Sequence, residues 1–73
     1  MNDNPAESEE EAALRTSLAA ARQEHADLDD AISALEAAAG SDQLRIARMK
    51  KRKLMLRDQI VLLEDQLTPD IIA

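Results

Sequence analysis

The chain has 73 residues, and it contains no cysteine, phenylalanine, tyrosine or tryptophan. The lack of cysteine excludes a disulfide framework and a thiolate metal ligand. The lack of these aromatic residues means that any core is aliphatic and that no Phe, Tyr or Trp ring can stack on a nucleobase. Glycine and proline are scarce as well, with one and two residues, while hydrophobic residues make up 45% of the chain. This composition is typical of a helical chain rather than a disordered one.

Hydrophobic runs are short, and none approaches the roughly 20 apolar residues that span a bilayer. The first residues, MNDNPAESEEE, also lack the basic and apolar regions of a signal peptide. We therefore expect a cytoplasmic protein that makes no membrane contact.

Groups that carry catalysis are few. His25 is the only histidine, and no glycine-rich turn offers a phosphate cradle or an oxyanion hole. His25 and Asp29, one helical turn apart, supply only two of the four ligands that a stable zinc site needs. A single core of this size contributes no more than roughly 3 to 5 kcal/mol of net stability. We predict a protein that is not an enzyme and has no metal, cofactor or small-molecule substrate.

Charge is distributed unevenly along the chain. The net charge is -6 at pH 7, but residues 1–36 carry ten acidic and two basic residues, whereas residues 37–73 carry seven basic and five acidic ones. All seven of these basic residues lie in the window 45–57, which contains no acidic residue. Such a bipolar chain indicates that the two halves bind each other, or that each binds a different partner.

Local signals predict two helices. Ser8, followed three residues later by a glutamate, is typical of a capping box at a helix start. Gly40 suits a left-handed position after a helix, and Ser41 or Asp42 is a candidate cap for the next one. Pro69 disfavours helical geometry at the residue before it. The predicted boundaries are a disordered segment 1–7, a helix 8–39, a turn 40–41, a helix 42–68 and a C-terminal tail 69–73.

A heptad seam with spacings of three and four residues runs along both helices. In the first helix its members are Leu14, Leu18, Ala21, His25, Leu28, Ile32 and Leu35. In the second helix they are Ile46, Met49, Lys53, Leu56, Ile60, Leu63 and Leu67. Polar residues in such a seam fix its register. Lys53 also has a stem long enough to carry its ammonium group to water. Protonation of His25 near neutral pH would add a charge to the seam, and we treat this pH switch as a hypothesis.

The same heptad continues through Gly40, so the periodicity permits one long helix in a parallel dimer as well as a hairpin. The parallel dimer opposes like charges at three places, Glu24 to Asp29, Arg45 to Lys50 and Arg52 to Arg57. We therefore predict an all-α fold, an antiparallel two-helix hairpin resembling a coiled coil that associates further into a helical bundle. Its edges are predicted to bring Asp29 near Lys50 and Arg15 near Glu64, with Arg22 against Arg57 as an unfavourable pair.

A second apolar strip, made of Leu54, Met55, Val61 and Leu62, faces away from the seam of the second helix. Soluble monomers seldom leave such a strip in water. The strip predicts self-association or a protein partner, whereas the alternative is that these are scattered surface hydrophobics.

The basic window offers an alternative function from another class. Its candidate phosphate contacts are Arg45, Arg48, Lys50, Lys51, Arg52 and Arg57. Without aromatic residues, binding to nucleic acid would follow the phosphate backbone and tolerate any base sequence. The isoelectric point of about 4.6 instead favours cations that neutralise the acidic first helix. We predict an interaction or structural protein, with nucleic-acid binding as the alternative.

Several stretches resemble the YdcH-like family of small bacterial proteins of uncharacterised function. The first helix has His25, Leu28-Asp29, Ile32 and Leu35-Glu36 in the order typical of that family. The stretches KKRKL and PDIIA are the most specific parts of a likeness that covers residues 14 to 73. Members often carry a second histidine beside the first, but here Ala26 follows His25, which weakens a metal site carried over from the family. The resemblance implies a cytosolic bacterial helical hairpin and supplies no catalytic residue or cofactor. The tail with Ile71 and Ile72 stays open between a docking peptide, a segment folded back on the helices and a frayed end.

Overall fold

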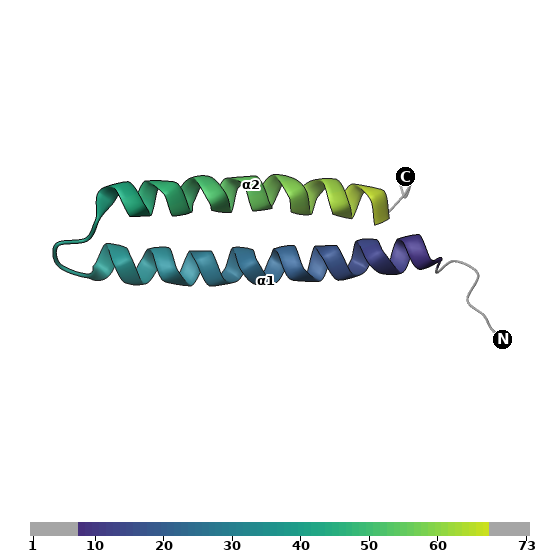
Figure 1. Cartoon of the computed structure of the whole chain (residues 1–73), viewed down its shortest axis with the longest axis horizontal. Coiled ribbons are helices and arrows are strands. Elements are labelled where there is room, and N and C mark those ends of the chain that lie inside the picture. The colour runs from purple at the N-terminus through teal and green to yellow at the C-terminus, as the bar shows by residue number, and fades with distance from the viewer. Residues whose placement is uncertain (1–7, 68–73) are drawn as a thin grey trace, which may run out of the picture.

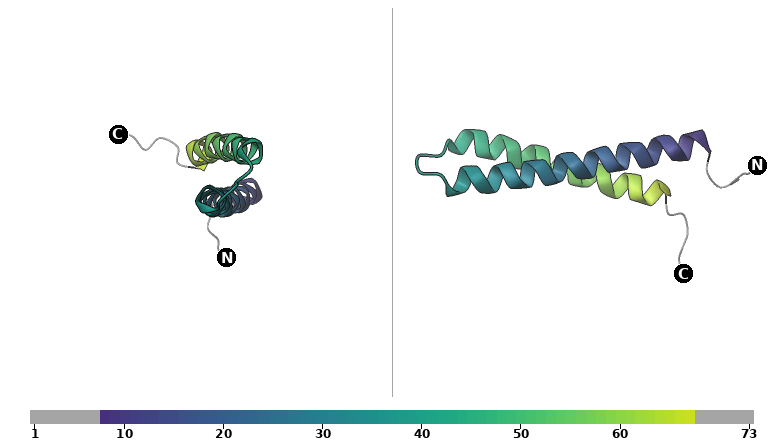
Figure 2. Two further views of the ribbon diagram at one scale, coloured as in Figure 1. Left: turned by 90° about the vertical axis from the view of Figure 1, so that its left-hand side faces the viewer. Right: turned by 90° about the horizontal axis from the view of Figure 1, so that it is seen from below.

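The computed structural model describes residues 8–67, and these form two helices. Helix α1 spans Glu9–Ala37 and helix α2 spans Gln43–Leu67. The helices run side by side in opposite directions and cross at a shallow angle (Figures 1 and 2). The predicted all-α hairpin is therefore confirmed, and the chain does not form one long helix. The predictions for residues 1–7 and for the tail 69–73 lie outside the described residues.

Helix α1 begins with the capping box that its sequence predicts. The Oγ of Ser8 accepts a hydrogen bond from the backbone N–H of Glu11 at 3.0 Å, and the Oε1 of Glu11 accepts one from the backbone N–H of Ser8 at 3.3 Å. Glu9, Glu10 and Glu11 occupy the first turn, where their negative charges favour the positive end of the helix dipole. These contacts satisfy N–H groups that have no partner inside the helix.

The reversal of the chain takes up residues 38–42. Ala38 already has an extended backbone, so α1 ends two residues before the predicted boundary at 39. Gly40 has a φ of 71°, the left-handed region that glycine enters without steric cost. Asp42 caps α2, because its Oδ1 accepts hydrogen bonds from the N–H groups of Leu44 and Arg45, both at 3.1 Å. Two alanines with high helix propensity are thus used in the loop, because the chain must leave α1 to reach α2.

The core lies along the single line of contact between the helices. Five side chains are buried there, with exposed fractions between 2% and 9%: Leu18, Ala21, Ile32, Ile46 and Leu56. The other nine seam positions are half-buried: Leu14, His25, Leu28, Leu35, Met49, Lys53, Ile60, Leu63 and Leu67. A contact between only two helices leaves each seam residue open on at least one side, which explains why so few are fully buried.

Two of the three contacts predicted at the edges of the seam differ in the structure. Arg22 pairs with Glu64 at 2.5 Å, so the expected clash with Arg57 is wrong. Asp29 pairs with Lys53 at 2.6 Å rather than with Lys50. The reason is the reach of long side chains. A charged residue at an edge can bind a partner up to one heptad away from the residue that lies level with it on the other helix. Two further pairs cross the hairpin, Lys50 with Glu36 at 2.8 Å and Arg52 with Glu24 at 2.9 Å.

Candidate functional site: the outer face of α2

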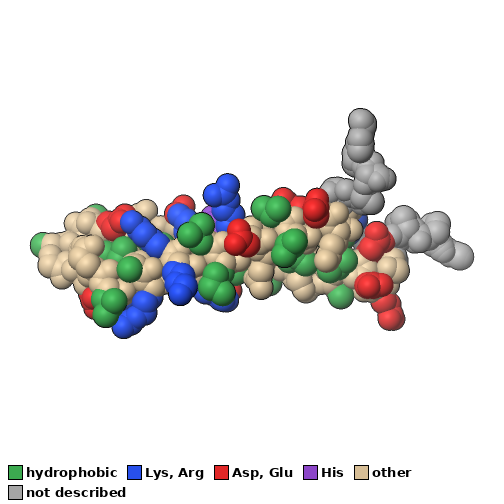
Figure 3. Space-filling view, turned by 90° about the horizontal axis from the view of Figure 1, so that it is seen from above, with side chains coloured by type: hydrophobic (Ala, Val, Ile, Leu, Met, Phe, Trp, Pro, Cys, Tyr) green, Lys and Arg blue, Asp and Glu red, His purple; other side chains and the backbone are tan. Residues whose placement is uncertain are grey.

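The side of α2 that points away from α1 carries large hydrophobic side chains that are exposed to solvent. We call it the outer face of α2, and its ten members follow the same heptad as the seam on the opposite side of the helix. They are Leu44, Ala47, Arg48, Lys51, Leu54, Met55, Asp58, Val61, Leu62 and Asp65, and all are exposed. Figure 3 looks onto this face and shows hydrophobic groups recurring along its whole length.

Large hydrophobic side chains on this face are open to solvent. The exposed fractions are 63% for Leu44, 59% for Leu54, 53% for Met55, 54% for Val61 and 61% for Leu62. These are all of the large exposed hydrophobics among residues 8–67. The strip predicted from the sequence is therefore found on the surface, away from the seam. The structure also adds Leu44, whose spacing of eleven residues from Met55 was the available signal, because eleven residues bring a helix back to the same side.

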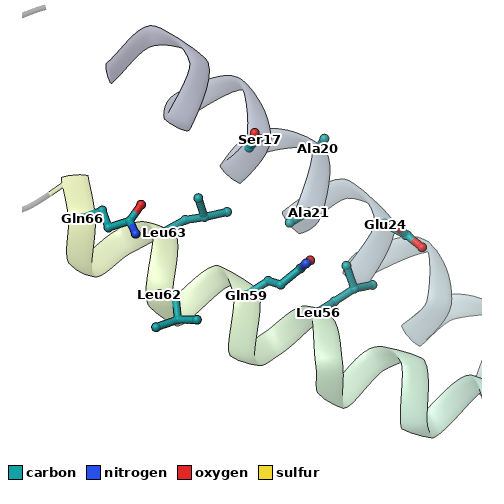
Figure 4. A pocket seen from close by; sticks show the side chains of 9 residues that line it. All are labelled: Ser17, Ala20, Ala21, Glu24, Leu56, Gln59, Leu62, Leu63 and Gln66. Carbon is teal, nitrogen blue, oxygen red and sulfur yellow. The ribbon is translucent and has the colours of Figure 1, made fainter. Parts of the chain in front are cut away.

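A shallow groove of about 520 Å³ continues from the outer face toward the line between the helices. In Figure 4 its wall on α1 is built of small residues such as Ala20 and Ala21, whereas α2 supplies Leu62, Leu63 and Gln66. Small side chains on one helix opposite long ones on the other leave this edge of the seam incompletely filled. Leu62 belongs to both the groove and the outer face, so the apolar surface is continuous between them.

The basic window does not form one patch. Lys50 and Arg52 lie at opposite edges of the seam and are paired with Glu36 and Glu24 of α1. Arg48 and Lys51 lie on the outer face, while Arg45 and Arg57 lie at the two edges of α2. The predicted phosphate contacts thus point to three sides of one helix, and two of the six are already neutralised within the hairpin.

Lys53 carries a charge into the seam and delivers it to the surface. Its side chain is 34% exposed, and its Nζ donates a hydrogen bond to Oδ1 of Asp29 at 2.6 Å. This hydrogen bond, and then the positive charge of Lys53, lower the pKa of Asp29; His25 adds a smaller effect in the same direction, and slight burial opposes it. Lys53 therefore occupies a seam position without burying an unpaired charge. The pH switch at His25 stays a prediction.

Residues 8–67 contain neither a metal-ligand cluster nor a membrane-spanning helix. No group of three or more histidine, aspartate or glutamate side chains there is placed to hold a metal ion. Neither α1 nor α2 is long and apolar enough to cross a membrane.

The chain matches the model of a known protein family. A family model described as protein of unknown function, DUF465, matches residues 18–64. The chain belongs to this family. DUF465 is the YdcH-like family, so the resemblance found in the sequence is confirmed. The matched range begins in the first part of α1 and reaches nearly to the end of α2, and it therefore includes most of the seam, the loop and most of the outer face. Neither the curated proteins nor the solved structures contain a match to the chain.

Proposed function

We propose that this member of the DUF465 family is a non-enzymatic interaction protein of the cytoplasm that binds protein through the outer face of α2. The observation that carries the proposal is the exposure of five large hydrophobic side chains, between 53% and 63%, on one face of one helix. Full burial of such a side chain is worth about 1.5 to 3 kcal/mol. Helical recognition surfaces use apolar anchors at this spacing, and a monomer gains nothing from keeping them in water.

Support for nucleic-acid binding is weaker. A phosphate-binding surface needs several free cations on one side, because its affinity grows with the number of phosphates neutralised together. Here Lys50 and Arg52 are paired within the hairpin, and only Arg48 and Lys51 share the outer face. Hydrophobic residues next to those two cations favour a protein surface instead.

The proposal is tested by placing a photo-crosslinking amino acid at Val61 in the full chain and irradiating cells of its natural source. The matched control carries the crosslinker at Ala26, which has the same heptad position on the outer side of α1. We expect protein adducts from position 61 and few from position 26. Absence of adducts from position 61, or equal yields from both positions, would overturn the proposal.

A second measurement separates the nucleic-acid alternative. The purified chain is titrated into duplex DNA and into RNA at low salt in a mobility-shift assay. We expect no shift at micromolar protein. A shift that is lost in the double variant Arg48→Gln/Lys51→Gln would overturn the proposal in favour of phosphate binding on the same face.

A further inference from the structure

The charges on the outer face of α2 are sorted along the helix. Arg48 and Lys51 lie in the half nearer the loop, and Asp58 and Asp65 lie in the other half. Within residues 8–67 none of these four takes part in an ion pair, whereas Arg22, Lys50, Arg52 and Lys53 each pair with a carboxylate on the other helix. The outer face therefore has two poles of opposite charge around a hydrophobic centre, and its charges have no partner in the hairpin.

Such a face is complementary to itself when turned end to end. We infer that a second copy of this chain packs its α2 antiparallel on the first, with the two-fold axis passing between Leu54 and Met55. This inference rests on the proposed function and names its partner. An isologous contact of this kind makes each interaction twice, so modest complementarity is doubled.

The axis sets which residues lie level with each other. Leu54 lies level with Met55 of the second copy, so the hydrophobic centre packs on itself. Lys51 lies level with Asp58 of the second copy, and each such pair occurs twice. Farther out, Ala47 lies level with Leu62 of the second copy, a small residue opposite a large one.

Other arrangements of the same face oppose like charges. In a parallel dimer every residue meets its own counterpart, so Lys51 would face Lys51 and Asp58 would face Asp58. Moving the antiparallel axis by half a heptad in either direction places the axis on Lys51 or on Asp58, which again brings identical charges together. Like charges in direct opposition cost affinity and exclude wrong registers.

This dimer would also change the environment of α2 itself. Helix α1 covers one side of it and the second copy would cover the opposite side, so α2 becomes the inner helix of the assembly. The continuous apolar surface from the outer face to the groove at Leu62 would then be covered at least in part.

The test uses sedimentation equilibrium of the full chain at low salt and up to about 100 µM, a range that detects the weak end of specific association. We expect a species of twice the 8.0 kDa chain mass. The variants Lys51→Asp and Asp58→Lys should each weaken the dimer by about tenfold. The double variant Lys51→Asp/Asp58→Lys should restore it, since both ion pairs are remade with reversed sign. The control Asp30→Lys changes an exposed charge on α1 and should leave the dimer unchanged.

Single cysteines test the direction of packing, because the natural chain has none. Leu54→Cys lies beside the axis and should form a disulfide dimer on oxidation. Leu44→Cys should not, because in the antiparallel dimer the two cysteines would be about 30 Å apart along the helices. Cross-linking of both variants would overturn the antiparallel arrangement in favour of a parallel one.

Two results would overturn the inference outright. One is a monomer at the highest concentration with the helix content of the hairpin intact. The other is a dimer that is indifferent to the single charge changes or is not rescued by the double change. Neither result touches the proposed function if position 61 still cross-links in cells to a protein other than a second copy, so the two failures are distinguishable.

Discussion

The outer sides of α1 and α2 have the same relation to the seam but opposite chemistry. Between residues 12 and 34, the outer side of α1 presents alanines, serine and threonine together with Gln23, Asp27 and Asp30. It carries no large hydrophobic group. On α2, the corresponding positions hold five large hydrophobics that are more than half exposed. Alanine favours the helix without needing a neighbour to cover it. The difference shows that the apolar excess of the chain is concentrated on one helix and not spread over the surface.

The largest effect is expected where a hydrophobic residue serves the hairpin and not the outer face. Leu56 is 2% exposed and Leu54, two residues earlier, is 59% exposed. Leu56→Ala should cost about 2 to 5 kcal/mol, enough to unfold a hairpin of this size. Leu54→Ala should keep the helix content, and any lost stability should depend on protein concentration. Circular dichroism during urea unfolding measures the stability of both variants, and it is repeated at about tenfold higher protein concentration. Equal losses in the two variants would mean that the inner and outer sides of α2 do not differ in role.

Making α1 resemble α2 should remove the contrast between them. Ala19 and Ala26 are exposed and one heptad apart on the outer side of α1. The double variant Ala19→Leu/Ala26→Leu should add an association of about tenfold or more in affinity, since two partly buried leucines supply that free energy. Both sides of the hairpin would then bind copies, and sedimentation velocity should show species larger than a dimer. The control Ala19→Gln/Ala26→Gln keeps bulk without hydrophobicity and should behave as the natural chain does. An unchanged mass in the leucine variant would show that apolar bulk alone does not drive association.

A smaller effect should separate edge charges from outer-face charges. Arg52 donates hydrogen bonds from two nitrogens to the two carboxylate oxygens of Glu24, at 3.0 and 3.1 Å. Because these side chains are 49% and 46% exposed, Arg52→Gln should cost at most about 1 kcal/mol of hairpin stability. That cost should shrink as salt is added. Lys51→Gln should leave the unfolding of the hairpin unchanged and weaken the dimer. Thermal melts at low and high salt, paired with sedimentation, distinguish the two, and a loss of hairpin stability in Lys51→Gln would contradict the assignment.

The smallest effect is expected on the stability of the hairpin at acid pH. The pKa of Asp29 is lowered in the hairpin, first by its hydrogen bond from Lys53 and then by the charge of that lysine. A carboxyl group with a lowered pKa in the folded state stabilises that state above its unfolded pKa, and the contribution is lost as the pH falls through the folded value, below about pH 4. Asp29→Asn should therefore make the melting temperature less sensitive to pH in that acid range. Lys53→Met removes the same pair from the other side and should have a similar effect. An acid dependence identical to that of the natural chain in both variants would exclude this pair as a source of it.

Much of this architecture follows from the sequence, because it depends on local and periodic signals. The capping box at Ser8 needs residues only three apart, and the seam needs a spacing that repeats over several turns. The glycine at position 40 marks the reversal, since few other residues adopt its φ of 71° cheaply. The strip on α2 could be found because four of its hydrophobics share one side of the helix.

Other details were not predictable from the sequence, because they depend on three-dimensional reach. The end of α1 at Ala37 reflects the path of the loop, which overrides the helix propensity of the next two alanines. The pairing of Arg22 with Glu64 depends on long side chains that bind across levels of the hairpin, which a pairing rule by heptad position misses. The sorting of unpaired charges on the outer face also depends on which other charges are paired within the hairpin, and the sequence does not show this.

The short reversal at residues 38–42 has a consequence for how the chain folds. Seam residues next to the loop, such as Leu35 and Ile46, are separated by few residues, and the separation grows steadily toward the open end. Closing a short loop costs little chain entropy, and each further layer then adds to an existing contact. We therefore expect the hairpin to close like a zipper from Gly40 outward, on the fast time scale of proteins with local contacts. The open end, where α1 starts and α2 finishes, should then be the last part to form and the first to exchange its amide hydrogens.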